Sequence, residues 1–166
     1  MFTTLDRTAL RRARSEDAAR IARLYIASQG VNGTAASRAS LDPATVQRWI
    51  RTSVIHDEVW VLEEEFGRLA GVLTLSGNEL ETLDVDPTLR GRGLGSRLLA
   101  HAKSRRPGGL TARLTQGRST ARAFLTHHGF VESANANTMM LTWRTPRGGG
   151  AQPPFRVLNG PVGARP

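Results

Sequence analysis

The residues best suited to chemistry lie in one glycine- and arginine-rich segment, Arg90-Gly91-Arg92-Gly93-Leu94-Gly95-Ser96. This segment follows an apolar run and precedes leucines at helical spacing, which predicts the order strand, loop and helix. The first N–H groups of a helix have no intrahelical acceptor, and they lie at the positive end of the helix dipole. The segment therefore predicts an anion site, above all for phosphate.

The spacing of this loop excludes two common phosphate-binding motifs. A Walker A loop needs Lys before Ser or Thr, whereas the only lysine of the chain is Lys103. A Rossmann loop needs G-x-G-x-x-G, and here the last glycine position falls on Ser96. The pattern that fits is R-x-x-G-x-G, at Arg90, Gly93 and Gly95. A flexible connector is the alternative interpretation, and the amphipathic helix expected after the loop favours a site.

Preceded by the strand pattern L-x-V-D-P, which starts at Leu83, this loop resembles the pyrophosphate-binding motif of the GNAT superfamily of acyl-CoA-dependent N-acyltransferases. The resemblance implies an α/β domain over residues 1–144 with the GNAT fold, a mixed central sheet of six to seven strands flanked by about four helices. It implies acetyl-CoA as the donor and needs no metal. The cofactor-binding residues that it implies are Leu83, Val85, Arg90, Gly91, Arg92, Gly93, Leu94, Gly95, Ser96, Arg118 and Phe124.

A second family motif, N-x-x-A-x-x-F-Y-x-x-x-G-F, aligns with residues 118–130. Four of the six positions match: Ala121, Phe124, Gly129 and Phe130. The two polar positions differ, because Arg118 replaces an Asn near the pantetheine arm and Leu125 replaces the Tyr that often protonates the departing thiolate. Three outcomes stay open. Water protonates the thiolate, since thiols have a pKa near 8.5; another side chain such as His127 or His128 does so; or the protein is an acyl-CoA-binding sensor module without rapid turnover.

N-acyl transfer also needs a base, because a free alkylammonium with a pKa near 10.4 must lose a proton before it attacks. The strand expected over residues 79–85 offers three carboxylates, Glu79, Glu81 and Asp84. Glu81 stands where many family members carry an acidic residue, and it is the predicted catalytic base. In a regular strand Asp84 points to the opposite face from Glu81, a parity that a β-bulge would change. For each of these carboxylates, an exposed charge on the strand without a catalytic role is an equally good explanation.

The remaining expectations concern the reacting groups around this strand. A backbone N–H near Val85 is expected to polarise the thioester carbonyl, and Asp86 is expected to form a turn with the proline that follows it. The sequence contains no cysteine, so we predict direct transfer in a ternary complex. The acceptor, a small-molecule or peptide amine, is expected around Tyr25, Trp49 and Met139, residues that core packing explains equally well.

The elements that must position these residues follow from periodicity and turn signals. Strands are expected over residues 10–14, 59–64, 69–75, 79–85, 110–114, 131–133 and 139–143. Helices are expected over residues 15–29, 93–104 and 119–128, and a further one starts at Pro43. Ser15 and Asp42 are the predicted N-caps, and Gly129 the residue that ends the last helix. Residues 30–40 read as a polar loop, and residues 145–166, rich in Gly and Pro, as a disordered tail.

Composition narrows the class of protein further. The 166 residues carry 23 basic and 14 acidic side chains, a net charge of +9. The arginines are scattered and not interleaved with aromatic residues, so we expect no nucleic-acid partner. A nucleic-acid-binding protein is nevertheless the third hypothesis, after an acyltransferase and an acyl-CoA sensor, because of the net charge. No signal peptide or membrane-spanning stretch is visible, which favours a cytoplasmic protein without a membrane partner. The sequence does not determine the oligomeric state, and a homodimer is one possibility.

Overall fold

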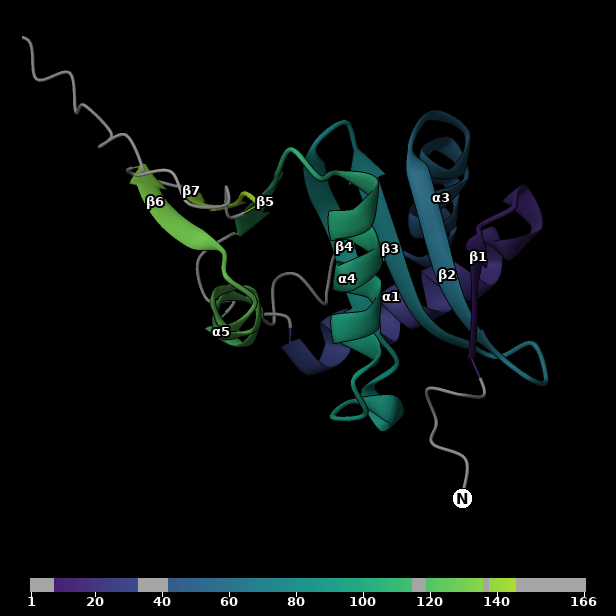
Figure 1. Ribbon diagram of the computed structural model, residues 1–166. Coiled ribbons are helices and arrows are strands. Elements are labelled where there is room, and N and C mark those ends of the chain that lie inside the picture. The colour runs from purple at the N-terminus through teal and green to yellow at the C-terminus, as the bar shows by residue number, and fades with distance from the viewer. Residues whose placement is uncertain (1–7, 33–41, 115–118, 136–137, 146–166) are drawn as a thin grey trace, which may run out of the picture.

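The computed structural model describes residues 8–32, 42–114, 119–135 and 138–145 (Figure 1). Within them, seven strands form one sheet in the order β1-β2-β3-β4-β5-β7-β6. The strands are β1 Thr8–Arg12, β2 Glu58–Glu64, β3 Leu69–Ser76, β4 Glu79–Val85, β5 Leu110–Leu114, β6 Val131–Asn135 and β7 Thr138–Trp143. All neighbours pair antiparallel except β4 and β5, which are parallel. The predicted mixed sheet is confirmed.

Four α-helices in the described part of the chain flank this sheet, as predicted. They are α1 Ala18–Asn32, α3 Pro43–His56, α4 Leu94–Arg105 and α5 Ser119–His127, and two short 3-10 turns, η2 Ser15–Asp17 and η3 Pro87–Leu89, precede α1 and α4. Helix α4 covers one face of the sheet, and α1 and α3 cover the other (Figure 1).

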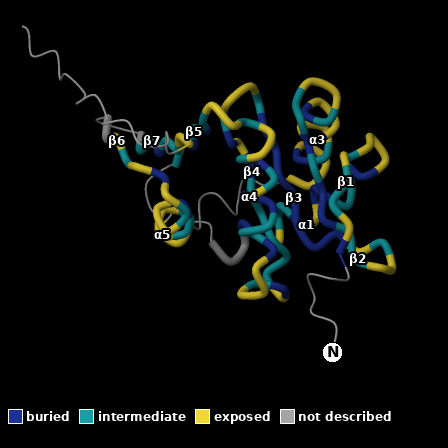
Figure 2. Tube along the Cα trace, viewed as in Figure 1, coloured by how far each residue is buried: buried dark blue, intermediate teal, exposed yellow. Residues whose placement is uncertain are grey.

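Both faces of the sheet are packed, which explains why its interior strand β3, between β2 and β4, is buried along almost its whole length (Figure 2). Leu73 belongs to the core cluster on the α4 side, and its neighbour Val72 belongs to the cluster formed with α1 and α3. Helix α4 contributes Leu98 and Leu99 to the first cluster, and α1 contributes Ile21 to the second. Apolar residues at helical spacing thus fix the two helical layers.

The parallel strands β4 and β5 diverge, and this divergence determines where a ligand can enter. Their pairing is recorded at one position, Glu79 with Thr111, near the start of both strands. The ion pair between Arg113 and Glu79, 2.6 Å long, lies at the same end. Beyond it the sheet is split, and the glycine-rich loop follows the far end of β4.

The helix ends test the predicted caps. The Asp42 carboxylate accepts a hydrogen bond from the Thr45 N–H at 2.8 Å, as predicted, and Gly129 has a φ of 83° after α5. The prediction of Ser15 as an N-cap is wrong, because Arg14 occupies that position. Asp17, three residues further on, binds the backbone of this N-cap: its carboxylate accepts from the Arg14 N–H at 2.8 Å.

Asp17 also anchors α1 to the first strands, which explains why this acidic residue is fully buried. Its carboxylate pairs with Arg11 at 2.7 Å and with Arg20. Both arginines also bind Glu63 on β2, at 2.6 and 2.9 Å. The hydrogen bonds from Arg11 are the main reason why the pKa of Asp17 is far below its usual value. This network joins α1 to β1 and β2.

Most other predicted boundaries are confirmed to within two residues, and α1 runs three residues further than expected, to Asn32. Most of the predicted loop, the predicted tail from residue 146 and Arg118 lie outside the described residues. No helix among the described residues is both long and apolar enough to cross a membrane.

Candidate active site

The glycine-rich loop is held at its entry by turn chemistry around Asp86, as predicted. The Asp86 carboxylate accepts from the Thr88 N–H at 2.9 Å and binds Arg68 at 2.7 Å. Pro87 starts the 3-10 turn η3, and the Asp86 N–H donates to the Ala70 carbonyl at 2.9 Å. The chain therefore leaves β4 in a fixed direction before it turns into α4.

Two glycines in this loop adopt a backbone conformation that other residues rarely take. Gly91 has a φ of 74° and Gly93 a φ of 79°, and Gly93 is the N-cap of α4. The first intrahelical bond of α4 runs from the Arg97 N–H to the Gly93 carbonyl at 3.0 Å. Helix geometry therefore leaves the N–H groups of Leu94, Gly95 and Ser96 directed out of the helix end.

Gly95 has a different role, because it gives the α5 side chain Phe124 room to approach. A Cβ atom at Gly95 would lie 3.4 Å from the Phe124 ring and 3.8 Å from Leu83. Phe124 thus closes the gap between α5 and the start of α4. The ring of His128 packs against it with centroids 4.6 Å apart.

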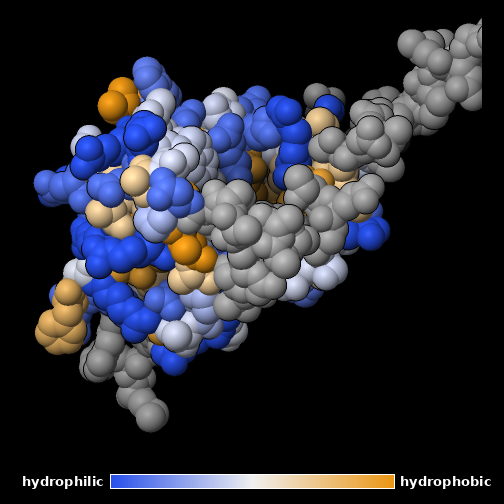
Figure 3. Space-filling model, turned by 180° about the vertical axis from the view of Figure 1, so that it is seen from behind, coloured by the Kyte–Doolittle hydropathy of each residue, from blue (hydrophilic) through white to orange (hydrophobic). Residues whose placement is uncertain are grey.

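A cavity of about 700 Å³ extends from this loop through the split between β4 and β5. Its walls come from β4, β5, the start of α4 and α5, and from α1 and α3 on the opposite side. The face seen from behind is mainly hydrophilic, with a hollow that exposes hydrophobic side chains in its depth (Figure 3). The cavity therefore passes from one face of the sheet to the other.

A β-bulge at Glu81 decides which side chains of β4 share a face. The register pairs Thr82 with Thr74 and Leu80 with Leu75, so Glu81 is an extra residue in β4. As a result Leu80 and Leu83, three residues apart, both pack in the core cluster on the α4 side. The parity of a regular strand, which would separate Glu81 from Asp84, does not hold here.

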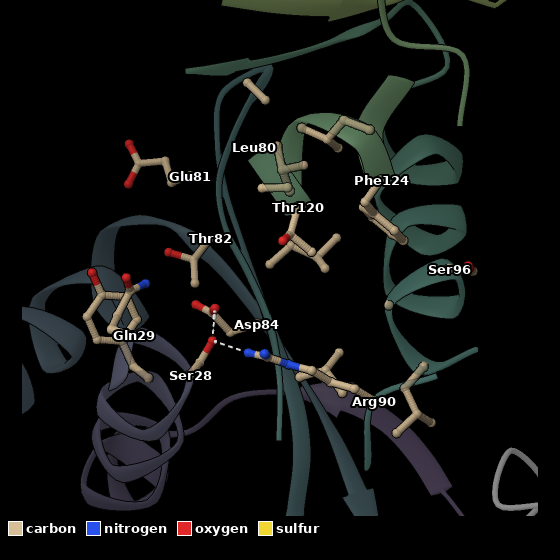
Figure 4. Close-up of a pocket in the computed structure, with 18 of the residues that line it drawn as sticks. Ser28, Gln29, Leu80, Glu81, Thr82, Asp84, Arg90, Ser96, Thr120 and Phe124 are labelled. Atoms are coloured by element: carbon tan, nitrogen blue, oxygen red, sulfur yellow. Dashed lines mark hydrogen bonds between the residues drawn. The ribbon is translucent and has the colours of Figure 1, made fainter. Parts of the chain in front are cut away.

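Strand β4 separates two sets of side chains (Figure 4). Ser28, Gln29, Glu81, Thr82 and Asp84 lie on one side, toward α1, and Thr120, Phe124 and Ser96 lie on the other. We call the first side, completed by Tyr25 and Trp49, the acceptor chamber. We call the second side, with the loop over residues 90–96, the cofactor cradle.

The register of β4 also fixes the direction of its N–H groups. Because Asp86 donates to β3, alternation along an antiparallel ladder directs the N–H groups of Leu83 and Val85 away from β3. They point toward the split, beyond the pairing of Glu79 with Thr111. The Val85 N–H is thus directed toward the split, and its role as the carbonyl donor stays a prediction.

The electrostatics of the acceptor chamber suit proton acceptance at Glu81. The residue is exposed at the mouth, but its carboxylate loses part of its hydration, and this loss raises its pKa. The charges of Asp57 and Glu79 raise the pKa further, while Arg113 lowers it. A carboxylate with a raised pKa is a stronger base at neutral pH.

The chain also resembles known proteins. Residues 56–132 match the family model described as an acetyltransferase (GNAT) domain. This match assigns a GNAT acetyltransferase domain to the segment from the end of α3 to the start of β6. The chain is 26% identical over 121 residues to the peptidyl-lysine N-acetyltransferase YjaB of Salmonella typhimurium, a match that covers 73% of this chain and 81% of that protein.

Two further comparisons agree with this assignment. YjaB of Escherichia coli, also described as a peptidyl-lysine N-acetyltransferase, is 32% identical over 81 residues, covering 49% of this chain and 54% of that protein. The PaiA N-acetyltransferase of Thermoplasma acidophilum in complex with coenzyme A is similar in structure, with a TM-score of 0.63 at 14% identity over 82% of this chain and 98% of that one. This last likeness shows the fold.

The structure brings most of the predicted site residues to one cavity. Those that line it are Glu81, Leu83, Val85, Arg90, Gly91, Gly93, Leu94, Gly95, Ser96 and Phe124. Arg92 is exposed on the same loop and is not part of the lining. Tyr25 and Trp49 line the cavity, with ring centroids 5.3 Å apart. Met139 does not line it and packs against the core, which was the alternative explanation for this residue.

The departures in the second motif have structural counterparts. Leu125 is buried and lines the cavity with an apolar side chain. His128 lies at the cofactor cradle, with its Nε2 atom 3.1 Å from the Ser96 hydroxyl. Burial lowers the pKa of His128, and the nearby Lys103 and His127 lower it further. His128 therefore lies beside the first turn of α4.

Sequence reasoning missed three buried polar residues of the acceptor chamber, Ser28, Gln29 and Thr82. Ser28 and Gln29 lie in the last turns of α1, where apolar periodicity carries no signal for them. Their only signal was polarity on a helix face that must be buried.

Proposed function

We propose that this protein transfers the acetyl group of acetyl-CoA to a primary amine, with the ε-amino group of a peptide lysine as the acceptor. The observation that carries the proposal is the cavity through the split sheet, with the N-terminus of helix α4 on one side and carboxylates on the other. The relatives described as peptidyl-lysine N-acetyltransferases support lysine as the acceptor.

The residues of the cofactor cradle suit the anionic part of coenzyme A. The N–H groups of Leu94, Gly95 and Ser96 would bind the pyrophosphate at the positive end of α4. Arg90 and Arg92 would add positive charge. The pantetheine arm would enter the split beside Phe124, whose approach Gly95 permits. The residues present fit this ligand, and the coenzyme A complex of the PaiA acetyltransferase supports the choice.

The chemistry proposed for the acceptor chamber is direct transfer. Glu81 accepts a proton from the ammonium group, and the neutral nitrogen then attacks the thioester carbonyl carbon, forming a C–N bond while the C–S bond breaks. The Val85 N–H stabilises the negative charge that develops on the carbonyl oxygen. After the attack the nitrogen releases its second proton to water and becomes the amide N–H. The thiolate takes its proton from water, because Leu125 offers none and a thiolate is weakly basic. The sequence contains no cysteine that could carry an acyl intermediate.

The test is an assay of thiol release. The full chain is incubated with acetyl-CoA and with Nα-acetyl-lysine amide, lysine peptides and small amines, and free coenzyme A is measured with a thiol reagent. The protein has no cysteine to give a background. We expect thiol release that depends on the amine, with the acetyl group found on the lysine nitrogen by mass spectrometry. Binding of acetyl-CoA without release for any amine would instead favour the sensor module that Leu125 suggests.

A further inference from the structure

A chain of hydrogen bonds links the cofactor cradle to the acceptor chamber. The Arg90 guanidinium donates from Nη2 to the Ser28 hydroxyl at 3.3 Å. The Ser28 hydroxyl in turn donates to the Asp84 carboxylate (Figure 4). The chain therefore joins the phosphate loop, helix α1 and strand β4, elements that are far apart in the sequence.

The position of Arg90 is unexpected for a residue of the phosphate loop. Its backbone belongs to the loop, yet its side chain extends past β4 into the acceptor chamber (Figure 4). Ser28, which receives it, is 1% exposed. The guanidinium is thus held close to a buried hydroxyl and, through it, to the carboxylate of Asp84.

This arrangement sets two anions in competition for one cation. A guanidinium near Asp84 weakens the attraction of that carboxylate for a second cation, because like charges repel strongly where solvent is partly excluded. A pyrophosphate on the N–H groups of residues 94–96 would attract the same guanidinium, since Arg binds phosphate in a bidentate geometry. The acceptor of an N-acetyltransferase arrives as an ammonium ion at neutral pH.

We infer that Arg90, Ser28 and Asp84 couple the two sides of the site: an occupied phosphate loop draws Arg90 away from Ser28, and Asp84 then binds the ammonium group of the acceptor. Asp84 is in this view the docking carboxylate, and Glu81 the base. The inference rests on the proposed function, and it adds that the enzyme binds a cationic acceptor better after coenzyme A. Linkage requires the reverse effect to be equally large.

The test is calorimetry with coenzyme A, which lacks the acetyl group and so permits no turnover. Nα-acetyl-lysine amide is titrated into the full chain with and without saturating coenzyme A. We expect binding of the amine to be about tenfold tighter with coenzyme A, within the range of about 5- to 150-fold that is usual for coupled sites. Equal affinity for the amine in the two titrations would overturn the inference.

Variants separate this coupling from a purely structural network. Arg90→Gln should bind the amine without coenzyme A about as tightly as the wild type does with it, so that the coupling falls below about twofold. Ser28→Ala should reduce the coupling while leaving both charges in place. Asp84→Asn should weaken amine binding in both states and leave coenzyme A binding intact. Coupling that persists in Arg90→Gln would contradict the inference.

Arg92→Gln is the matched control, because it removes the same charge from the same loop at an exposed position. It should weaken coenzyme A binding but keep the coupling. An equal loss of coupling in Arg90→Gln and Arg92→Gln would show that the coupling comes from the total charge of the loop and not from the position of Arg90. That result would overturn the inference. Thiol release from acetyl-CoA with Nα-acetyl-lysine amide separates the two proposals: release without coupling rejects the inference alone, and no release with any amine rejects the proposed function.

Discussion

The cofactor cradle and the acceptor chamber are built in different ways. The cradle comes mainly from one continuous segment, the loop over residues 90–96, with Thr120 and Phe124 of α5 beside it, and it presents backbone N–H groups whose direction two glycines fix. The chamber collects side chains from α1, α3 and β4, which are distant in sequence. A site made of backbone depends on local conformation and tolerates changes of side chain. A site made of side chains depends on the packing that brings its elements together.

The two regions also differ in charge. The cradle offers the positive end of a helix with Arg90 and Arg92 nearby, and the chamber offers Glu81 and Asp84. A donor that carries phosphates and an acceptor that carries an ammonium group are thus separated by charge before they meet at β4. The following substitutions test this division.

The largest effect should come from Glu81→Gln in the acceptor chamber. Loss of a general base lowers rates by about 10²- to 10⁴-fold, so kcat with a lysine substrate should fall at least about 100-fold while coenzyme A affinity stays unchanged. In the wild type, activity should fall as the pH drops through the raised pKa of Glu81, because the protonated carboxyl group accepts no proton. Glu79→Gln, in the same strand, is the control and should keep most of the activity. A wild-type rate in Glu81→Gln would show that Glu81 is not the catalytic base.

The next effect concerns stability, since the chamber wall α1 is anchored by Asp17. Asp17→Asn should lower the free energy of unfolding in urea by about 2 kcal/mol, less than the 3–5 kcal/mol of a fully buried pair because Arg11 and Arg20 are partly exposed. The folded state lowers the pKa of Asp17, so its stabilisation is present above pH 4 or so and is lost as the pH falls below the unfolded value of about 3.9. The exposed Glu16→Gln should change little, and equal losses in both would contradict the anchoring role.

The cradle should respond to backbone strain. Gly93→Ala places a side chain at a φ of 79°, which costs about 1–2 kcal/mol. Relaxation of that strain would turn the first N–H groups of α4, so the Kd for coenzyme A should rise about tenfold in calorimetry. Gly108→Ala is the control, because Gly108 has open space around its Cβ position and no positive φ. Unchanged coenzyme A binding in Gly93→Ala would show that the cradle does not depend on this conformation.

The smallest effect should come from Trp49→Ala at the rim of the chamber. Trp49 is 38% exposed and packs edge to face on Tyr25. A cation near an exposed aromatic ring gains about 0.5–1 kcal/mol, so the KM for a lysine peptide should rise a few-fold with kcat unchanged. Ile55→Ala, on the same helix and 70% exposed, should leave KM as it is. If the KM for acetyl-CoA rose by the same factor, Trp49 would not belong to the acceptor chamber alone, and this prediction would be wrong.

The sequence by itself predicted the strand, loop and helix that form the cradle, because the information for them is local. Gly91 and Gly93 mark positive φ, and the leucines that follow mark the helix, so the loop could be placed without any long-range contact. The strands β2 and β3 and the Asp42 cap were predicted for the same reason. The prediction of Ser15 as the N-cap was wrong because the buried ion pairs of Asp17 with arginines, and not the local turn, determine how this helix begins.

Only the tertiary structure decided the acceptor chamber. The bulge at Glu81 arises from the register between β3 and β4, and it places Glu81 on the same side of β4 as Asp84. The contact of Ser28 with Asp84 and Arg90 spans 56 and 62 residues. No hydrophobic periodicity or turn motif in the sequence indicates the bulge or these contacts, since each depends on how separate elements pack together. Local backbone conformation is written in neighbouring residues, whereas the meeting of distant side chains is settled by the fold as a whole.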